Sequence, residues 1–256
     1  MQERLQKILS QAGIGSRRFC ETLISGGKVS VNGQLVTELG TKADYSIDKI
    51  TVDGQSIEIS KDKIYILLNK PEGYTTTRSD PHAKKTVMEL LPFKDEYMYP
   101  IGRLDIDTSG LLILTNDGDF TQLLSHPKHK IDKTYLAKVK GKISPSDMRK
   151  LESGIVLEEG LTAPAEVNLV RYLAAPNVSI VKLVIHEGRK RQVRRMFANI
   201  FHDVISLSRV SIGSLTLEDM KPGQFRYLDK EEVRLLKAMA SGKQKQRAVS
   251  KVSKSR

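Results

Sequence analysis

The order of strands and helices beyond residue 61 constrains the fold more than any other feature of this 256-residue chain. Five segments have the alternating or continuously apolar pattern of strands, namely residues 64–69, 110–115, 133–139, 166–172 and 179–186. Helical spacing fits residues 87–91, 119–124, 146–153, 191–200 and 231–239. Because strands and helices do not alternate as in a doubly wound fold, the pattern predicts an α+β domain on a mixed, mostly antiparallel sheet.

The first sixty residues have a separate pattern, two short helices followed by a small sheet. Helical spacing covers residues 3–12, and Ser16 stands where the N-cap of a second helix belongs. The period then changes to two, with a hairpin over residues 28–36 and a further strand over 49–52. We therefore expect an α/β module over residues 1–60, a larger domain over 61–240, and a basic, disordered tail over 241–256.

The balance of charge favours a polyanionic partner. Lys and Arg total 42 against 30 Asp and Glu, which gives a formal net charge of +12. Half of this excess lies in the acid-free tail, and the first module adds none, with seven basic and seven acidic residues. Nucleic acid is the polyanion that best fits a chain without lipid-binding stretches.

Other features exclude several classes of protein. The chain has no run of 18 apolar residues, so no membrane span is expected, and its first residues lack the pattern of a secretory signal. The single cysteine, Cys20, excludes an intrachain disulfide, and we expect a cytoplasmic protein. A Walker A loop, Gly-x-Gly-x-x-Gly, His-Glu-x-x-His and a nucleophile elbow are all absent, so we expect neither a cofactor nor a metal.

Three segments contain the candidate functional residues. The loop at 102–110 places two acids, Asp105 and Asp107, directly before an apolar strand; an equally good interpretation is that they cap backbone amides of a turn. The second segment places Tyr135 at the start of a strand, where tyrosines more often pack in a core. The third, residues 186–197, has five basic residues among the seven from 189 to 195, which indicates phosphate binding.

Together, and in this order, these segments resemble the pseudouridine synthases that modify ribosomal RNA. The matching blocks are Gly-Arg-Leu-Asp with Thr-Ser-Gly-Leu-Leu at 102–112, Lys-Thr-Tyr at 133–135, Glu-Gly-Arg-Lys-Arg-Gln-Val-Arg-Arg-Met-Phe at 187–197, Leu-Asn-Lys-Pro-Glu-Gly at 68–73 and Leu-Ser-Arg-Val-Ser-Ile-Gly at 207–213. The resemblance covers residues 61–236 and is to the branch that modifies one uridine of small- or large-subunit RNA. The first module resembles the small RNA-binding fold of ribosomal protein S-four.

The resemblance implies a mechanism that depends on one aspartate. Pseudouridine forms when the bond between ribose C1′ and uracil N1 breaks, the base turns, and its C5 rejoins C1′. The match assigns the essential carboxylate to Asp105 and not Asp107, either as a nucleophile at C1′ or as the base that removes the C2′ proton. Tyr135 would pack against the flipped uracil and assist loss of the C5 proton, and Arg194 would pair with Asp105.

The other roles follow from the same resemblance. Arg103 would fill the gap that the flipped nucleotide leaves, and Leu207 would form an apolar wall under the base. Phosphate contacts would come from the remaining cations of the third segment, Arg189, Lys190, Arg191 and Arg195. RNA contacts of the first module would come from Arg17, Arg18 and Lys28, unless that module serves dimerisation or folding.

The expected function is therefore site-specific conversion of uridine to pseudouridine in ribosomal RNA. The first module and the basic tail favour large-subunit (23S) over small-subunit (16S) RNA, and the sequence leaves open whether naked RNA or a ribosomal-subunit precursor is the substrate. We expect a monomer without a membrane partner. The alternative from another class is a non-catalytic RNA-binding factor of ribosome assembly, which would have no need for an acid that faces RNA. A third interpretation is a DNA-binding protein, but the sequence has no recognisable helix-turn-helix or zinc finger.

Overall fold

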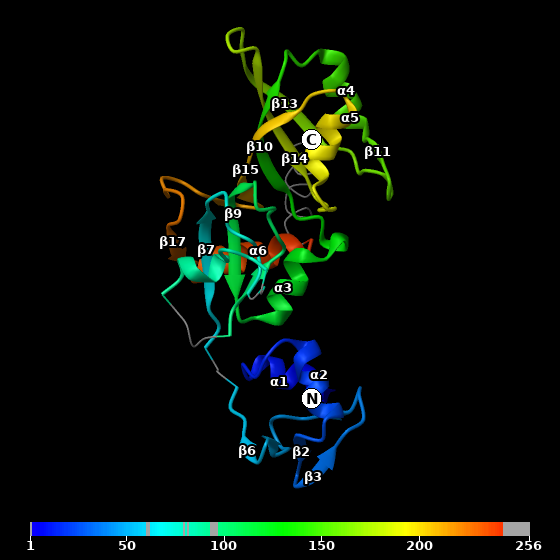
Figure 1. Ribbon diagram of the computed structural model, residues 1–256, viewed down its shortest axis with the longest axis vertical. Helices are drawn as coiled ribbons and strands as arrows, with labels where there is room; N and C mark the ends of the chain where they lie inside the picture. Colours follow the sequence, from blue (N-terminus) through cyan, green and yellow to red (C-terminus); the bar gives the residue numbers. More distant parts are fainter. Residues whose placement is uncertain (1, 60–61, 79, 81, 93–96, 243–256) are drawn as a thin grey trace, which may run out of the picture. The chain divides into compact units, whose positions relative to one another are not determined.

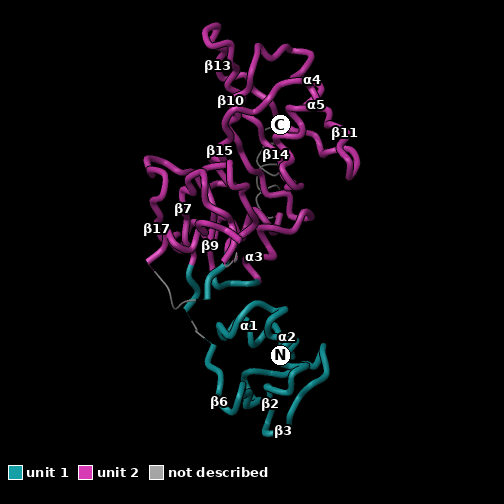
Figure 2. The backbone as a smooth tube through the Cα atoms, viewed as in Figure 1, with its two compact units in different colours: residues 1–64, 93–99, 116–118 teal, residues 65–92, 100–115, 119–256 magenta. Residues whose placement is uncertain are grey.

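The computed structural model describes residues 2–59, 62–78, 80, 82–92 and 97–242. The chain divides into two compact units, coloured separately in Figure 2. The first contains Met1–Ile64, Phe93–Tyr99 and Asn116–Gly118, and the second contains Tyr65–Pro92, Pro100–Thr115 and Asp119–Arg256. Among the described residues, no helix is both long enough and apolar enough to span a membrane. The predicted tail lies outside the described residues from position 243 onward.

The first unit combines two helices with a small antiparallel sheet. The helices α1 (Leu5–Gln11) and α2 (Arg17–Ser25) lie where the sequence predicts them, and the Ser16 side chain caps α2 by accepting the Phe19 N–H. The sheet has the order β3-β2-β5-β6, with the strands β2 (Val29–Val31), β3 (Gln34–Val36), β5 (Ile50–Val52) and β6 (Gln55–Ser56). The strands β1 (Glu3–Arg4) and β4 (Lys42–Ala43) form a separate pair. Cys20 is fully buried in the core of this unit, so it packs as a small apolar residue.

The described part of the second unit is built on one nine-stranded sheet (Figure 1). Its main path runs β13-β14-β10-β15-β9-β7-β17, formed by β13 (Glu166–Leu173), β14 (Val178–Ile185), β10 (Lys133–Lys140), β15 (Val204–Ile212), β9 (Ser109–Thr115), β7 (Tyr65–Lys70) and β17 (Phe225–Tyr227). Two short strands extend it, β8 (Tyr99–Ile101) beside β9 and β16 (Leu215–Thr216) beside β15. Neighbours on the main path are antiparallel except β15 and β9, which are parallel, so the predicted mixed, mostly antiparallel sheet is confirmed.

The helices of the second unit cover different parts of this sheet. The helices α3 (Gly118–Ser125) and α6 (Lys230–Ala240) pack on β7 and β9, in a core that includes Leu67, Ile113, Phe120 and Leu236. The helices α4 (Pro145–Ser153) and α5 (Gln192–Asn199) lie with β10, β13 and β14 in the other half of the unit (Figure 1). A small hairpin, β11 (Val156–Leu157) and β12 (Gly160–Leu161), follows α4. Two 3-10 helices, η1 (Val87–Leu90) and η2 (Pro127–His129), complete the described elements of this unit.

Two of the differences between the structure and the sequence prediction are at β15 and at residues 87–91. The strand β15 lies between β10 and β9, yet no strand is predicted there, because its serines dilute the apolar pattern of Val-Ile-Ser-Leu-Ser-Arg-Val-Ser-Ile. The predicted helix at residues 87–91 is only the single 3-10 turn η1, which the side chains of Thr86 and Glu89 cap reciprocally. The missed strand matters more, because it forms one wall of the site described below.

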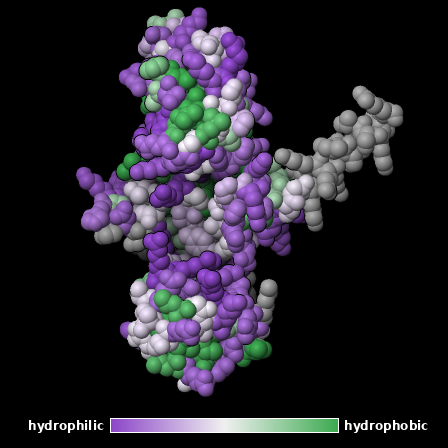
Figure 3. Space-filling view, turned by 90° about the vertical axis from the view of Figure 1, so that its right-hand side faces the viewer, coloured by the Kyte–Doolittle hydropathy of each residue, from purple (hydrophilic) through white to green (hydrophobic). Residues whose placement is uncertain are grey.

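Hydrophilic residues, coloured purple, cover most of the face of each unit shown in Figure 3, and apolar patches lie between them. Exposed apolar side chains include Val156 and Leu161 of the hairpin β11–β12, and Phe201 after α5. A surface of this kind fits a chain in which 28% of the residues are charged.

Candidate active site

The loop between β8 and β9, residues 102–108, is fixed from two sides. The Lys70 ammonium at the end of β7 donates to three backbone carbonyls, those of Pro71, Asp105 and Thr108, at 3.1, 3.1 and 2.8 Å. The Thr76 hydroxyl donates to the Leu104 carbonyl at 2.7 Å and accepts the Leu104 N–H at 3.2 Å. These contacts hold the backbone on both sides of the Asp105 side chain, so this carboxylate has a defined position.

Gly110 brings this loop close to β15. Its φ is +109°, and a Cβ at this position would lie 2.2 Å from the Arg209 carbonyl oxygen. The close approach is the parallel pairing of β9 with β15, in which Ser109 lies opposite Ser208 and Gly110 opposite Arg209. A glycine is therefore required where the Asp105 loop enters the sheet.

A pocket of about 320 Å³ is enclosed by the loop, the sheet and the segment before α5. It is lined by four residues to which the sequence analysis gave a role at the target nucleotide, Arg103, Asp105, Tyr135 and Leu207, and by the predicted phosphate contacts Arg189, Lys190 and Arg191. Tyr135 and Leu207 are buried, Asp105 is half-buried and Arg103 is exposed. No hydrogen bond or ion pair joins the Asp105 carboxylate to another described residue, so its oxygens are available to a ligand in the pocket.

Arg194 pairs with Asp107, and the expected pair with Asp105 is wrong. Arg194 Nε lies 3.3 Å from Asp107 Oδ2, and its Nη2 donates to the Asp107 carbonyl. Arg191 binds the same carboxylate with two hydrogen bonds of 3.0 and 2.9 Å. Arg191 is the N-cap residue of α5 and Arg194 lies in its first turn, and both reach the same acid. The Arg191 hydrogen bonds, with the nearby charge of Arg194, hold the pKa of Asp107 below its usual range.

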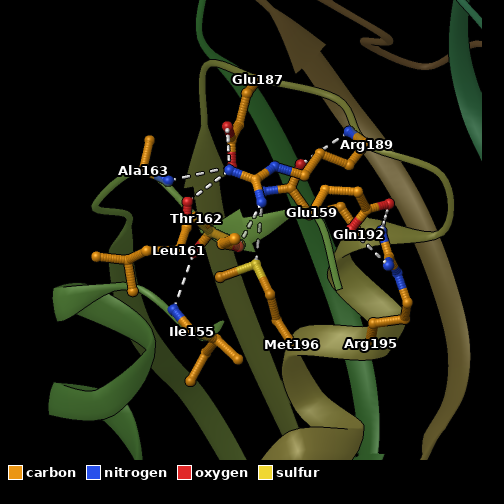
Figure 4. Close-up of polar contacts among 11 residues, drawn as sticks. Ile155, Glu159, Leu161, Thr162, Ala163, Glu187, Arg189, Gln192, Arg195 and Met196 are labelled. Atoms are coloured by element: carbon orange, nitrogen blue, oxygen red, sulfur yellow. Dashed lines mark hydrogen bonds and ion pairs between the residues drawn. The ribbon is translucent and has the colours of Figure 1, made fainter. Parts of the chain in front are cut away.

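Two further arginines of the basic segment bind the hairpin β11–β12 (Figure 4). Arg189 donates from Nη1 to the Gly160 carbonyl at 2.6 Å and from Nη2 to the Leu161 carbonyl. Arg195 makes a bidentate pair with Glu159 at 2.8 and 3.0 Å. The sequence predicted phosphate contacts here from the density of positive charge, and it could not show that acids from other elements reach the same helix.

The remaining predicted RNA contacts are exposed cations. Lys190 lies at the rim of the pocket and makes no hydrogen bond or ion pair with any residue that the structure describes. Arg17, Arg18 and Lys28 are exposed in the first unit, and Lys28 Nζ lies 3.6 Å from Asp53 Oδ2. Their predicted contact with RNA stays a prediction.

Three site residues were not found by sequence reasoning, namely Lys70, Lys133 and Arg209. All three stand inside the matched blocks, but a charged residue in a strand has no local pattern that marks it as functional. Burial lowers the pKa of Lys70 to about 8, against the opposing charges of Glu72 and the aspartates. In the described part of the chain, no group of three or more His, Cys, Asp or Glu side chains is placed to hold a metal ion.

Comparisons with known proteins give matches for both parts of the chain. Residues 64–199, which contain the Asp105 loop, Tyr135 and α5, match the RNA pseudouridylate synthase family, and residues 3–44 match the S4 domain. A protein of Bacillus subtilis named ribosomal large subunit pseudouridine synthase B is 51% identical over 239 residues, which are 93% of this chain and 97% of that protein. An uncharacterized RNA pseudouridine synthase of Mycobacterium leprae is 43% identical, over 91% of each chain.

A solved structure has the same architecture. The crystal structure of a pseudouridylate synthase matches with a TM-score of 0.66 and 28% sequence identity, and the match covers 91% of this chain and 99% of that one. The family match spans more than half of the chain and the relatives cover nearly all of it. This chain therefore belongs to the RNA pseudouridylate synthase family.

Proposed function

We propose that this protein converts a specific uridine of large-subunit ribosomal RNA to pseudouridine, with Asp105 as the reacting group. The observation that supports this most directly is the state of the Asp105 carboxylate. Its backbone is fixed by Lys70 and Thr76, while its oxygens face a pocket with no protein partner among the described residues. A held but unpaired carboxylate suits a group that must bond to a sugar carbon, or accept its proton, and then release it.

Tyr135 and Leu207 are suited to hold the base. Both are buried in the pocket walls, on the neighbouring strands β10 and β15. The ring of Tyr135 offers a flat apolar surface for the uracil, and Leu207 adds an aliphatic one. Tyr135 also has a hydroxyl that can assist loss of the C5 proton after the new bond forms.

The target nucleotide must leave its helix to reach this pocket, because Asp105 cannot approach C1′ of a stacked base. Arg103 is two residues from Asp105, exposed, and at the edge of the same pocket. Its planar guanidinium can stack in the gap that the nucleotide leaves. Arg191 and Arg194 take a positioning role through Asp107, since their charges fix α5 to the loop.

The RNA substrate is inferred from charge and from the relatives. Lys190 at the pocket rim, with Arg17, Arg18 and Lys28 in the S4 domain, offers exposed cations to phosphates. The Bacillus subtilis relative is named for the large ribosomal subunit, and this chain covers 97% of its length. We infer that the enzyme acts in the cytoplasm, as a monomer, on this RNA or on a precursor of the subunit.

Two experiments test the proposal. Pseudouridine mapping of ribosomal RNA from cells with and without the gene should show one missing modification in the large-subunit RNA; a missing site in small-subunit RNA would contradict the choice of substrate. In vitro, Asp105→Asn should abolish product formation while RNA binding changes by less than about tenfold. The matched control Asp107→Asn keeps one side-chain oxygen for Arg191 and the backbone carbonyl for Arg194, so it should retain measurable turnover.

A further inference from the structure

Two cations lie inside the pocket beside Asp105 and Tyr135. Arg209 belongs to β15 and Lys133 to β10, and both line the cavity. Neither forms an ion pair with a carboxylate of the described residues, in contrast to Arg189, Arg191 and Arg195 of the basic segment. The pocket therefore contains positive charge that no described acid neutralises by direct contact.

Arg209 is built into the site with one amino group unpartnered. Arg209 is only 3% exposed, and its Nε donates to the Leu111 carbonyl at 2.8 Å. Its Nη2 is buried and has no hydrogen-bond partner within the described chain. A buried donor of a charged group is costly to leave unpaired, so a ligand acceptor is the expected partner.

A β-bulge in β15 places the side chains of Leu207, Arg209 and Ile212 on the same face of the sheet. Thr134 pairs with Ser211, but Tyr135 pairs with Arg209, so Val210 is an extra residue opposite β10. The bulge changes the phase of the strand, and Ile212 faces the pocket together with Leu207 and Arg209. Without the extra residue, strict alternation would send Ile212 and Arg209 to opposite faces.

Lys133 is held at the same wall. Its Nζ donates to the carbonyls of Ile131 at 3.2 Å and His186 at 3.4 Å, which leaves one of its three N–H groups for another acceptor. Burial, and then the charge of Arg209, lower the pKa of Lys133 to about 8, against the opposing charge of Asp132. The side chain is therefore still mainly protonated at neutral pH.

The reaction produces a negative charge where these cations lie. When the C1′–N1 bond breaks, its electron pair stays on N1, and the detached uracil is an anion with its charge shared by N1, O2 and O4. C1′ bonds to an Asp105 oxygen, or Asp105 takes the C2′ proton, and in both cases the base is anionic. When C5 bonds to C1′, Asp105 returns to its initial state. Loss of the C5 proton and protonation of N1 then complete the isomerisation with atoms and charge balanced.

We infer that Arg209 and Lys133 bind the oxygens of the uracil and stabilise the base as an anion while it is detached from the ribose. This rests on the proposed function, and it adds two residues that touch the reacting base. In an active site, fixed donors aimed at a developing charge typically accelerate a reaction by about 100- to 1000-fold each. The same two cations also keep the anion in the pocket while it turns.

The test compares uridine with 5-fluorouridine at the target position of a large-subunit RNA fragment. Fluorine withdraws electrons and stabilises the detached base as an anion. It therefore replaces part of the stabilisation that the two cations provide. We expect Arg209→Gln to slow single-turnover loss of uridine by about 100-fold and Lys133→Met by about tenfold or more. For Arg209→Gln, the decrease in rate relative to the wild-type enzyme should be at least about tenfold smaller on 5-fluorouridine than on uridine. Arg209→Lys keeps the charge, so it should recover part of the rate on uridine.

Controls separate chemistry from folding. Lys138 lies on β10 but, by strand alternation, on the face away from the pocket, so Lys138→Met should keep the wild-type rate on both RNAs. Thermal unfolding of each variant shows whether the fold is retained. Equal losses on the two RNAs, or wild-type rates for both Arg209→Gln and Lys133→Met, would overturn the inference. A wild-type enzyme that converts neither RNA would instead refute the proposed substrate, and the inference with it.

Discussion

Replacing Lys70 by methionine tests whether a buried charge holds the Asp105 loop. Lys70 is fully buried, and its ammonium donates to the carbonyls of Asp105 and Thr108 in the loop and to that of Pro71. Methionine has a similar length and donates nothing. At about 1–1.5 kcal/mol per hydrogen bond, the substitution loses about 3–4 kcal/mol of favourable interaction.

The cost of burying the ammonium opposes this loss. Burial lowers the pKa of Lys70 from 10.5 to about 8, which corresponds to about 3 kcal/mol against the charged form in the folded protein at pH 7. The two effects nearly cancel, so Lys70→Met should unfold with a free energy within about 2 kcal/mol of the wild type. The single-turnover rate should fall by at least about tenfold, because Asp105 is no longer held in one position.

The difference in unfolding free energy between the wild type and Lys70→Met should change with pH. Below about pH 8 Lys70 is charged in both the folded and the unfolded chain, so the burial cost is present in full. Between about pH 8 and 10.5 the folded chain has released a proton that the unfolded chain keeps, so the wild type gains stability relative to Lys70→Met. Urea denaturation of both proteins from about pH 7 to 10 measures this difference, and the titration of other groups cancels. A difference in unfolding free energy that stays constant over this pH range would refute the reasoning, and so would wild-type turnover by Lys70→Met.

Three further predictions use other parts of the structure. Gly110→Ala should destabilise the fold by more than about 2 kcal/mol in urea denaturation, because its Cβ would lie 2.2 Å from the Arg209 carbonyl; Gly73→Ala, where nothing lies within 4 Å, should cost less. Deleting residues 1–60 should raise KM and lower kcat/KM by about 10- to 1000-fold, while the rate at saturating enzyme is retained; a collapse of that saturated rate in a folded variant contradicts this. Activity should persist in excess chelator, because the described residues include no group of side chains placed to hold a metal ion; turnover that returns only with added zinc or magnesium contradicts that.

Local patterns made much of the fold predictable. The helices α1 and α2, the Asn32-Gly33 hairpin and the apolar strand β9 each follow from spacing within a few residues, and the structure has all of them. The strand β15 was not predictable in this way, because its strand character comes from two neighbours that pair with it. Those neighbours, β10 and β9, are about 70 and 95 residues away in sequence.

The site shows the same limit for side chains. The matched blocks were enough to select Asp105, Tyr135 and Leu207, which line one pocket. The partner of Arg194 was not predictable, because two aspartates stand two residues apart and only the packed loop determines which one faces α5. The pairing of Arg195 with Glu159 likewise joins residues 36 apart, beyond any helical spacing that a sequence reveals.

The contrast between Asp107 and Asp105 explains how one loop can serve both structure and chemistry. Asp107 is bound by two arginines, and a carboxylate so engaged is a poor nucleophile and a poor base. Asp105 has no such partner among the described residues, and Arg209 and Lys133 line the pocket where we propose that the base lies. An arginine bound tightly to Asp105 would stabilise the free carboxylate and oppose its bond to the sugar. Cations placed at the base do not oppose the bond between Asp105 and the sugar, and they stabilise the uracil anion that leaves. The distribution of charge therefore favours breaking the bond between sugar and base, and the loop keeps this arrangement because Asp107 and Lys70 fix it from both sides.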